Sequence, residues 1–201
     1  MSTLAEAWPY LVFASLHLVA GQGLATLIYR ARFGGSPLVL YAAGAAGEHG
    51  RRTRWVAVAT TLWVSAFVAA LLWPAFGGHV LGAPLLSIPA AAGWIVGGVG
   101  LVGMLAAQVG MGAAFRVGQD HNETPALVTT GLHSRSRNPV YVFSMLYLFG
   151  VSLWVPCPAV LAGLVALAVG IHRLVLTEER FLAASLGPQV QDYYGRVRRY
   201  L

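Results

Sequence analysis

The sequence predicts an all-α polytopic membrane protein: about five transmembrane helices, including a short C-terminal helical hairpin, and a cytoplasmic amphipathic C-terminal helix. Of the 201 residues, 57% are apolar and only 10% are charged, and the mean hydropathy is +0.67. A soluble domain typically carries about 25% charged residues. The stretches 55–115 and 138–172 also lack Arg, Asp and Glu entirely. These observations together exclude an ordinary soluble domain.

The first part of the chain, residues 1–114, predicts an N-terminal transmembrane domain with three spans. A transmembrane helix needs roughly 20 apolar residues. Residues 8–29, 55–76 and 85–114 each supply such a stretch. Residues 36–47 are apolar but number only 12, so they predict an interfacial or re-entrant segment.

The remaining residues, 115–201, predict a polar loop, a transmembrane hairpin and a charged tail. Residues 138–172 have room for two short spans of about 17 residues each, separated by Pro156 and Pro158. Residues 177–201 are amphipathic. Gly187 and Pro188 interrupt them, because Gly is typical of a helix end and Pro of a helix start.

The positions of the arginines predict the orientation in the membrane. All 13 basic side chains are Arg. The long uncharged stretches each hold two spans, so every arginine falls on one side, which the positive-inside rule makes cytoplasmic. We therefore expect the N-terminus outside, the C-terminus inside, and a bacterial inner (plasma) membrane, since the Arg, Ala and Gly usage is typical of a GC-rich genome. The clusters are at 30–32, 51–54, 116, 135–137, 173–180 and 196–199.

Polar residues gather at the two ends of the predicted hairpin. Because a hairpin brings its ends together, its entrance should face the start of the tail. Arginine offers a planar fork for carboxylate or phosphate, and carboxylates accept from ammonium or hydroxyl groups. We therefore expect a site for a small zwitterionic cofactor on the cytoplasmic face, formed by Arg137, Asn138, Tyr141, Arg173, Glu178 and Glu179.

The same region resembles a known family. The sequence from Leu127 to Leu132 is followed by Arg-Asn-Pro-Val-Tyr at 137–141, Glu-Glu-Arg-Phe-Leu at 178–182, Leu-Gly at 186–187 and Tyr-Tyr at 193–194. This order and spacing are similar to those of the integral membrane methyltransferases, which include isoprenylcysteine carboxyl methyltransferase and the phospholipid N-methyltransferases. The resemblance covers about residues 108–201, and the first three spans show no comparable signal.

The resemblance implies S-adenosylmethionine as cofactor, bound by the hairpin and its flanking loops. His133 takes the place of a family tyrosine, and Asn138 that of the family histidine. Arg173 lies one residue from the place of a substrate-contacting arginine, which Leu174 occupies here. The implied cofactor-binding residues are Gln119, Pro125, Ala126, Leu127, Val128, His133, Asn138, Pro139, Val140, Tyr141 and Glu178, and the candidate catalytic residues are Arg137, Arg173 and Glu179.

The asparagine at position 138 bears on the expected mechanism. Imidazole can act as a general base near neutral pH, whereas an amide cannot. A carboxylate acceptor needs no base, while an amine would have to lose a proton to water or Glu179. Asn138 therefore favours a carboxylate acceptor or a mechanism that depends on positioning alone.

Several readings of the function stay open from the sequence. The first is a methyltransferase acting on a lipid-like or isoprenoid small molecule that enters from the bilayer, among membrane lipids as partners. The second is a membrane reductase of the sterol-reductase type, which uses NADPH. The third is a small transporter or assembly factor without enzymatic activity. The histidines lack the spacing of metal ligands, so we expect no metal, and arginines flanking apolar spans do not indicate nucleic-acid binding.

Overall fold

The computed structural model describes residues 4–19, 23, 25–33, 47–72, 88–115 and 126–201. Within these ranges the chain is helical without strands, which confirms the all-α class. An isolated parallel bridge joins Ser136 to Arg198. The helices are α1 (Leu4–Leu18), α2 (Ala25–Phe33), α3 (Gly47–Leu72), α4 (Ala90–Met111), α5 (Pro139–Ser152), α6 (Pro158–Leu186) and α7 (Pro188–Arg196), with 3-10 turns η3 (Gly112–Ala114) and η4 (Gly131–Ser134).

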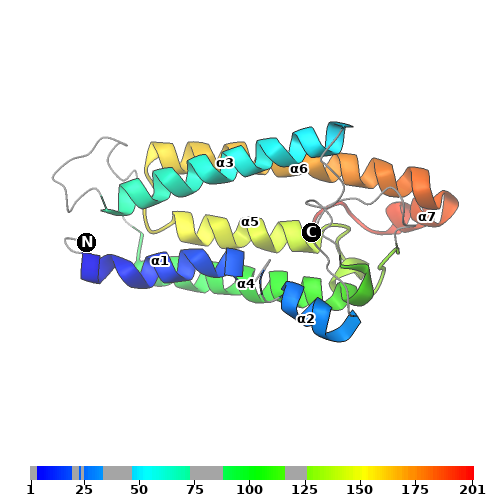
Figure 1. Ribbon diagram of the computed structural model, residues 1–201, viewed down its shortest axis with the longest axis horizontal. Coiled ribbons are helices and arrows are strands. Elements are labelled where there is room, and N and C mark those ends of the chain that lie inside the picture. Colours follow the sequence, from blue (N-terminus) through cyan, green and yellow to red (C-terminus); the bar gives the residue numbers. More distant parts are fainter. Residues whose placement is uncertain (1–3, 20–22, 24, 34–46, 73–87, 116–125) are drawn as a thin grey trace.

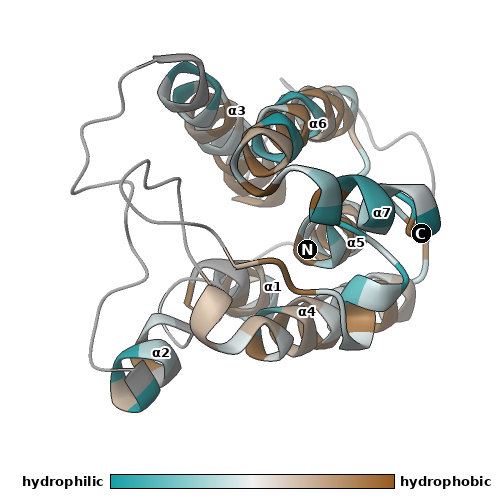
Figure 2. Ribbon diagram, turned by 90° about the vertical axis from the view of Figure 1, so that its right-hand side faces the viewer, coloured by the Kyte–Doolittle hydropathy of each residue, from teal (hydrophilic) through white to brown (hydrophobic). Residues whose placement is uncertain are grey.

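Helix α5 lies in the middle of an elongated bundle. Figure 1 shows α3 beside α6 on one side of α5, and α1 beside α4 on the other; the principal contacts join α4 to α5 and α3 to α6. Helix α7 covers one end of the bundle, where the chain returns toward the start of α5. The view along the bundle in Figure 2 shows hydrophilic residues on α7 at this end, and also on parts of α2, α3 and α6.

Glycines allow α4 and α5 to pack backbone against backbone. A Cβ added to Gly100 would stand 2.7 Å from Tyr147 Cα, and one added to Gly150 would stand 2.7 Å from Gly97 Cα. Small residues at helix contacts let backbones approach closely in membrane proteins. The glycines that the sequence places on the third span therefore serve packing within this chain at positions 97 and 100, whereas Gly98 has nothing within 4 Å of its added Cβ.

The other half of the core joins α3 to α6 and α5. Trp63 and Phe67 of α3 are almost fully buried, and their rings stack with centroids 5.6 Å apart. The indole N–H of Trp63 donates to Ser152 Oγ at 3.3 Å, at the end of α5. The Tyr147 hydroxyl donates to the carbonyl of Phe13, which fastens α1 to α5. These buried polar contacts fix the register of the bundle.

Three helices are long and apolar enough to cross a membrane: Gly50–Leu72, Ala90–Ala114 and Pro158–Leu186. The other apolar helices in the described ranges are shorter, at Ala7–Leu16 and Pro139–Ser152. The predicted span 8–29 instead contains α1 and the start of α2, with residues 20–22 and 24 outside the described ranges. The five-span count is therefore not established by helix length.

The lengths predicted for the C-terminal hairpin were wrong, although its break was placed correctly. Helix α5 has 14 residues and α6 has 29, instead of two equal spans. Helix α6 runs without interruption from Pro158 past Glu179, because no further Pro occurs before Pro188, and Gly163 and Gly170 lie within the helix without ending it. Residues 177–186 thus continue α6, and the predicted interruption of the tail separates α6 from α7.

In the N-terminal half, one predicted boundary differs from the observed helix and one predicted segment lies almost wholly outside the described residues. Helix α3 begins at Gly47 rather than near residue 55, so the arginines at 51, 52 and 54 lie on the helix itself. Arginine is a good helix former, so charge alone does not end the helix. The interfacial segment predicted at 36–47 falls outside the described residues except for Gly47, the first residue of α3.

Candidate functional site

The site lies where α5 begins and where α6, α7 and residues 197–201 meet its first turn. Asn138 occupies the N-cap of α5, a position where an asparagine side chain normally accepts from backbone N–H groups. It makes no such cap bond here. Its amide nitrogen donates instead to Glu179 Oε1 at 3.1 Å and to the Arg199 carbonyl at 3.2 Å. The side chain therefore serves a polar cluster rather than the helix end.

Glu179 is the centre of this cluster, and its side chain is only 8% exposed. Its Oε2 accepts from Arg199 Nε at 2.9 Å, while Oε1 accepts from Asn138. Arg137 Nε lies 3.6 Å from Oε1, close enough for charge attraction. A buried carboxylate is tolerated when it is paired and hydrogen-bonded. Glu179 meets both conditions, so each of its oxygens already has a protein partner.

Arg137 is held by an aromatic ring as well as by charge. Its Cζ lies 4.4 Å from the centre of the Tyr194 ring, a cation–π arrangement. Burial, with the Glu179 carboxylate second, raises the pKa of Tyr194 to about 12. The hydroxyl therefore keeps its proton and donates to the Glu179 carbonyl at 3.1 Å. Arg137 Nε is buried, and among the described residues no atom forms a hydrogen bond with it.

The second carboxylate of the pair faces α5. Tyr141 lies one turn into α5, and its hydroxyl donates to Glu178 Oε1 at 2.8 Å. The structure thus brings together the two ends of the hairpin, as the sequence predicted. Glu178 and Glu179 are adjacent on α6 but bind different partners, Tyr141 and the Asn138–Arg199 pair.

His133 lies in η4 beside this cluster and is 6% exposed. Its carbonyl accepts from the Tyr193 hydroxyl at 2.5 Å, which ties η4 to α7. Its Nδ1 is buried and has no hydrogen-bond partner in the part of the chain that the structure describes. Burial lowers the pKa of His133, so the imidazole is neutral at pH 7. A buried polar atom without a partner costs stability, and a bound ligand can supply the missing bond.

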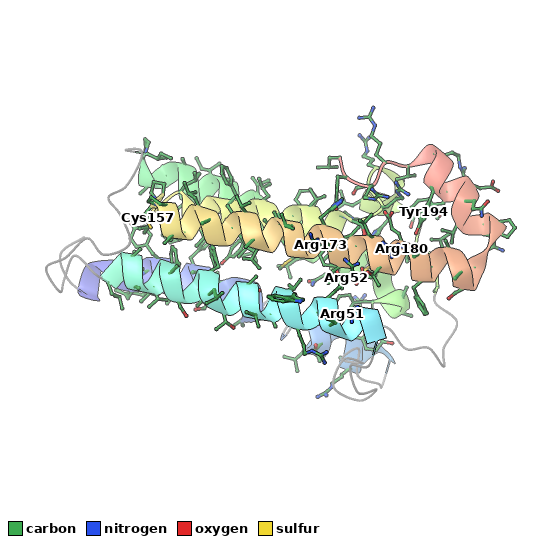
Figure 3. The ribbon with its side chains drawn as sticks, turned by 90° about the horizontal axis from the view of Figure 1, so that it is seen from above. Arg51, Arg52, Cys157, Arg173, Arg180 and Tyr194 are labelled. Carbon is green, nitrogen blue, oxygen red and sulfur yellow. The ribbon has the colours of Figure 1, made fainter. Side chains whose placement is uncertain are left out.

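Arg173 is placed apart from the cluster. It is exposed on α6, six residues before Glu179, and this spacing places the two side chains about 120° apart around the helix axis. Figure 3 shows Arg173 near Arg52 of α3, with Tyr194 farther along at the α7 end. Arg52 Nη1 donates to the Arg173 carbonyl at 3.2 Å. Arg173 therefore lies on a different face of α6 from Glu179.

The other predicted cofactor-binding residues are distributed around the entrance to α5. Pro139 is buried as the first residue of α5, with Val140 half-buried after it. Leu127 and Val128 are half-buried and Ala126 is exposed, in a segment without regular structure before η4. Gln119 and Pro125 lie outside the described residues.

Arg199 and Ser136 belong to the cluster but were not predicted from the sequence. From the sequence, Arg199 was used only as one of the arginines at 196–199 that predict the orientation in the membrane. The Ser136 hydroxyl donates to the Arg199 carbonyl at 3.4 Å and accepts from the backbone N–H of Asn138 at 3.2 Å. Two adjacent carboxylates near a membrane need nearby cations, and this requirement could have directed attention to the C-terminal arginines.

A family model described as phospholipid methyltransferase matches residues 88–189. The chain belongs to the phospholipid methyltransferase family. The match begins just before α4, so the expectation that the third span carries no family signal was wrong. The pattern of α4 consists of glycines at packing positions rather than of polar motifs, and this explains why it was overlooked. A search of curated proteins and a search of solved structures each gave no match.

The family and the helices together make this a membrane methyltransferase of the phospholipid type. Such enzymes generally use S-adenosylmethionine, a zwitterion that also carries a sulfonium. The cluster contains cationic, anionic and neutral polar groups, and the buried Nδ1 of His133 and Nε of Arg137 have hydrogen-bonding capacity to spare. These groups are chemically suited to such a cofactor. Among the described residues, no group of three His, Cys, Asp or Glu side chains is arranged to hold a metal ion.

Proposed function

We propose that this chain is an S-adenosylmethionine-dependent methyltransferase embedded in the membrane, which transfers a methyl group to a lipid-like or isoprenoid small molecule. The observation that carries the proposal is the polar cluster of Asn138, Glu178 and Glu179 at one end of an apolar bundle. Ionisable groups beside hydrocarbon are costly and usually functional. Family membership favours a methyltransferase over an NADPH-dependent reductase, a transporter or an assembly factor.

Different residues of the cluster would bind different charged groups of the cofactor. Arg137 would hold the carboxylate of the cofactor's amino-acid part, since its buried Nε has no hydrogen-bond partner among the residues that the structure describes. Glu178, held by Tyr141, would accept from the ammonium group. The neutral His133 would use Nδ1, and the stretch from Ala126 to Val128 would line the site beside it.

Asn138 presents an acceptor to this site. Its amide nitrogen must face Glu179 Oε1 and the Arg199 carbonyl, because both of those oxygens only accept. Its oxygen is therefore turned away from both, and no hydrogen bond to it is found within the described part of the chain. Asn138 Oδ1 would accept from an N–H or O–H of the bound molecules, without removing a proton.

The bound cofactor supplies an electrophilic methyl group on sulfur. The chain's contribution is alignment and exclusion of water, which are worth several kcal/mol when the reacting groups are held in place. Glu179 would have to release Asn138 or Arg199 before it could take a proton from an amine acceptor. The arrangement therefore favours an acceptor that is already nucleophilic, such as a carboxylate. Arg173, on the face toward α3, would hold an anionic headgroup of the acceptor.

For the topology, we propose five spans with the N-terminus outside and the C-terminus and the site in the bacterial cytoplasm. The start of α3 and helix α7 lie at the end of the bundle that carries the site (Figure 1), and Figure 3 shows Arg51, Arg52, Arg173 and Arg180 between the middle of the bundle and that end. A reporter fused after Leu201 should be active only in its cytoplasmic form. A reporter that is active only outside would contradict this orientation.

A ligand-binding assay on purified protein in lipid nanodiscs distinguishes a methyltransferase from an NADPH-dependent reductase. We expect S-adenosylhomocysteine, but not NADPH, to bind by calorimetry. Glu178→Gln should weaken binding on the order of tenfold or more, because a hydrogen bond to a charged group is lost. Asp192→Asn, which removes an exposed carboxylate on α7, is the matched control. Binding of NADPH alone would establish the reductase reading instead.

The methyl acceptor can be identified directly. Wild-type protein would be incubated with labelled S-adenosylmethionine and a native lipid extract, and labelled products would be identified by mass. We expect a labelled amphiphile with wild-type protein and little with Glu178→Gln. Label found only in water-soluble products would contradict a lipid-like acceptor.

A further inference from the structure

We propose that Arg199, in the segment that follows α7, is a positioning residue of the cofactor site and acts through Glu179 and Asn138. The inference rests on the proposed function and adds to it a segment beyond the family match, which ends at residue 189. Figure 1 shows the chain returning from α7 to the start of α5, where Asn138 lies. We call residues 197–201 the strap.

The backbone of the strap is attached to the loop before α5. The Arg137 amide donates to the Arg198 carbonyl at 2.9 Å, and Ser136 and Arg198 form a parallel bridge. Beyond them, the Tyr200 hydroxyl and His172 Nδ1 of α6 are hydrogen-bonded at 2.8 Å. These contacts do not involve the guanidinium group of Arg199. The strap should therefore stay in place when that side chain is changed.

Arg199 contacts the site through both its side chain and its carbonyl. Its Nε donates to Glu179 Oε2 at 2.9 Å, and its carbonyl accepts from Asn138 Nδ2 at 3.2 Å. Asn138 also donates to the other oxygen of Glu179. The three residues therefore form a closed set of contacts in which the position of each depends on the other two.

Arg199 is the cation that best neutralises Glu179. Arg137 lies farther away, at 3.6 Å, and its guanidinium is stacked on Tyr194. Leaving a buried carboxylate without its partner is strongly unfavourable. Without Arg199, Glu179 would turn toward Arg137 and draw the Asn138 amide with it. Both groups proposed to face the cofactor, Arg137 and Asn138 Oδ1, would then be displaced.

Adjacent arginines in the strap provide a matched comparison. Arg199→Met and Arg198→Met each remove one positive charge and keep an unbranched stem, but the Arg198 side chain is exposed. The measurement is the Kd of S-adenosylhomocysteine for the full chain in nanodiscs, with thermal unfolding of each sample. We expect Arg199→Met to raise Kd on the order of tenfold, the size of a strong pairwise coupling. Arg198→Met should leave Kd within about twofold, and Arg199→Lys should recover part of the loss.

A double variant tests whether Arg199 acts through Glu179. In a Glu179→Gln background, Arg199→Met should change Kd much less than it does in wild-type protein, because its partner charge is already absent. An equal effect in both backgrounds would show that Arg199 acts elsewhere. A general loss of stability would lower the unfolding temperature but would not produce this dependence on Glu179.

The outcomes separate the inference from the function on which it rests. Failure of the wild type to bind S-adenosylhomocysteine overturns the proposed function and the inference with it. Wild-type binding with equal Kd for Arg199→Met and Arg198→Met overturns the inference alone. If Arg199→Met does not fold, the comparison moves to Arg199→Lys and Arg198→Lys, which keep both charges; equal Kd values in that pair also overturn it.

Discussion

Replacing Gly100 by alanine tests the close packing of α4 on α5. The added Cβ would stand 2.7 Å from Tyr147 Cα and 2.8 Å from Phe143 O, and closer still to Tyr147 N. The first of these separations is about 0.7 Å below the 3.4 Å at which ordinary contact begins. Since the atoms in the way belong to the backbone of α5, the helices must separate along their seam. We expect a loss of about 1–3 kcal/mol or somewhat more, the range for overpacking.

Gly98 supplies the control for this substitution. It lies on the same helix, and its added Cβ has nothing within 4 Å. Gly98→Ala should be neutral or stabilising by up to about 1 kcal/mol, because alanine favours helix. The assay is denaturant or thermal unfolding of both variants in the same detergent, monitored by circular dichroism. Equal stability of Gly100→Ala and Gly98→Ala would refute the backbone-to-backbone contact.

Three further predictions concern single contacts. Ser152→Ala should destabilise the fold by about 1–3 kcal/mol, because the buried Trp63 indole N–H loses its acceptor; unchanged thermal unfolding would argue against that bond. Tyr141→Phe should raise the Kd of S-adenosylhomocysteine on the order of tenfold, since Glu178 loses a charge-assisted donor; calorimetry showing wild-type affinity would remove Tyr141 from the site. His133 has a folded pKa below its unfolded value of 6.5, so the unfolded state binds more protons and stability falls as pH drops below 6.5. His133→Asn should flatten this fall in unfolding free energy, and an unchanged pH profile would contradict the lowered pKa.

Much of the helix order followed from the sequence because it depends on local signals. Pro156 and Pro158 separate α5 from α6, and Gly187 with Pro188 separates α6 from α7. The pairing of Tyr141 with Glu178 followed from the hairpin, which brings residues 37 positions apart to one end. Such features need only the knowledge of where helices stop and turn back.

The features that were missed depend on packing that no local pattern reveals. Helix α6 passes through charged residues without a break, so the edge of the apolar stretch did not mark its end. Arg199 contacts Glu179 only because the chain folds back after α7. In the sequence, nothing distinguishes it from the other arginines that flank the apolar stretches. Asn138 at an N-cap would normally cap its helix, and only the tertiary structure shows that its side chain is used elsewhere.

The shortness of α5 has a consequence for how an acceptor would reach the site. Its 14 residues span about 21 Å, less than the roughly 30 Å of the hydrocarbon layer, and Figure 1 shows α6 extending well beyond its first turn. In the proposed topology, where α5 is one of the spans, the polar cluster at Asn138 would be recessed toward the lipid rather than raised above it. Lifting an acyl or prenyl chain into water costs about 0.8 kcal/mol for each CH₂. An acceptor methylated at this depth keeps its chain in the membrane, so the reaction avoids that extraction cost.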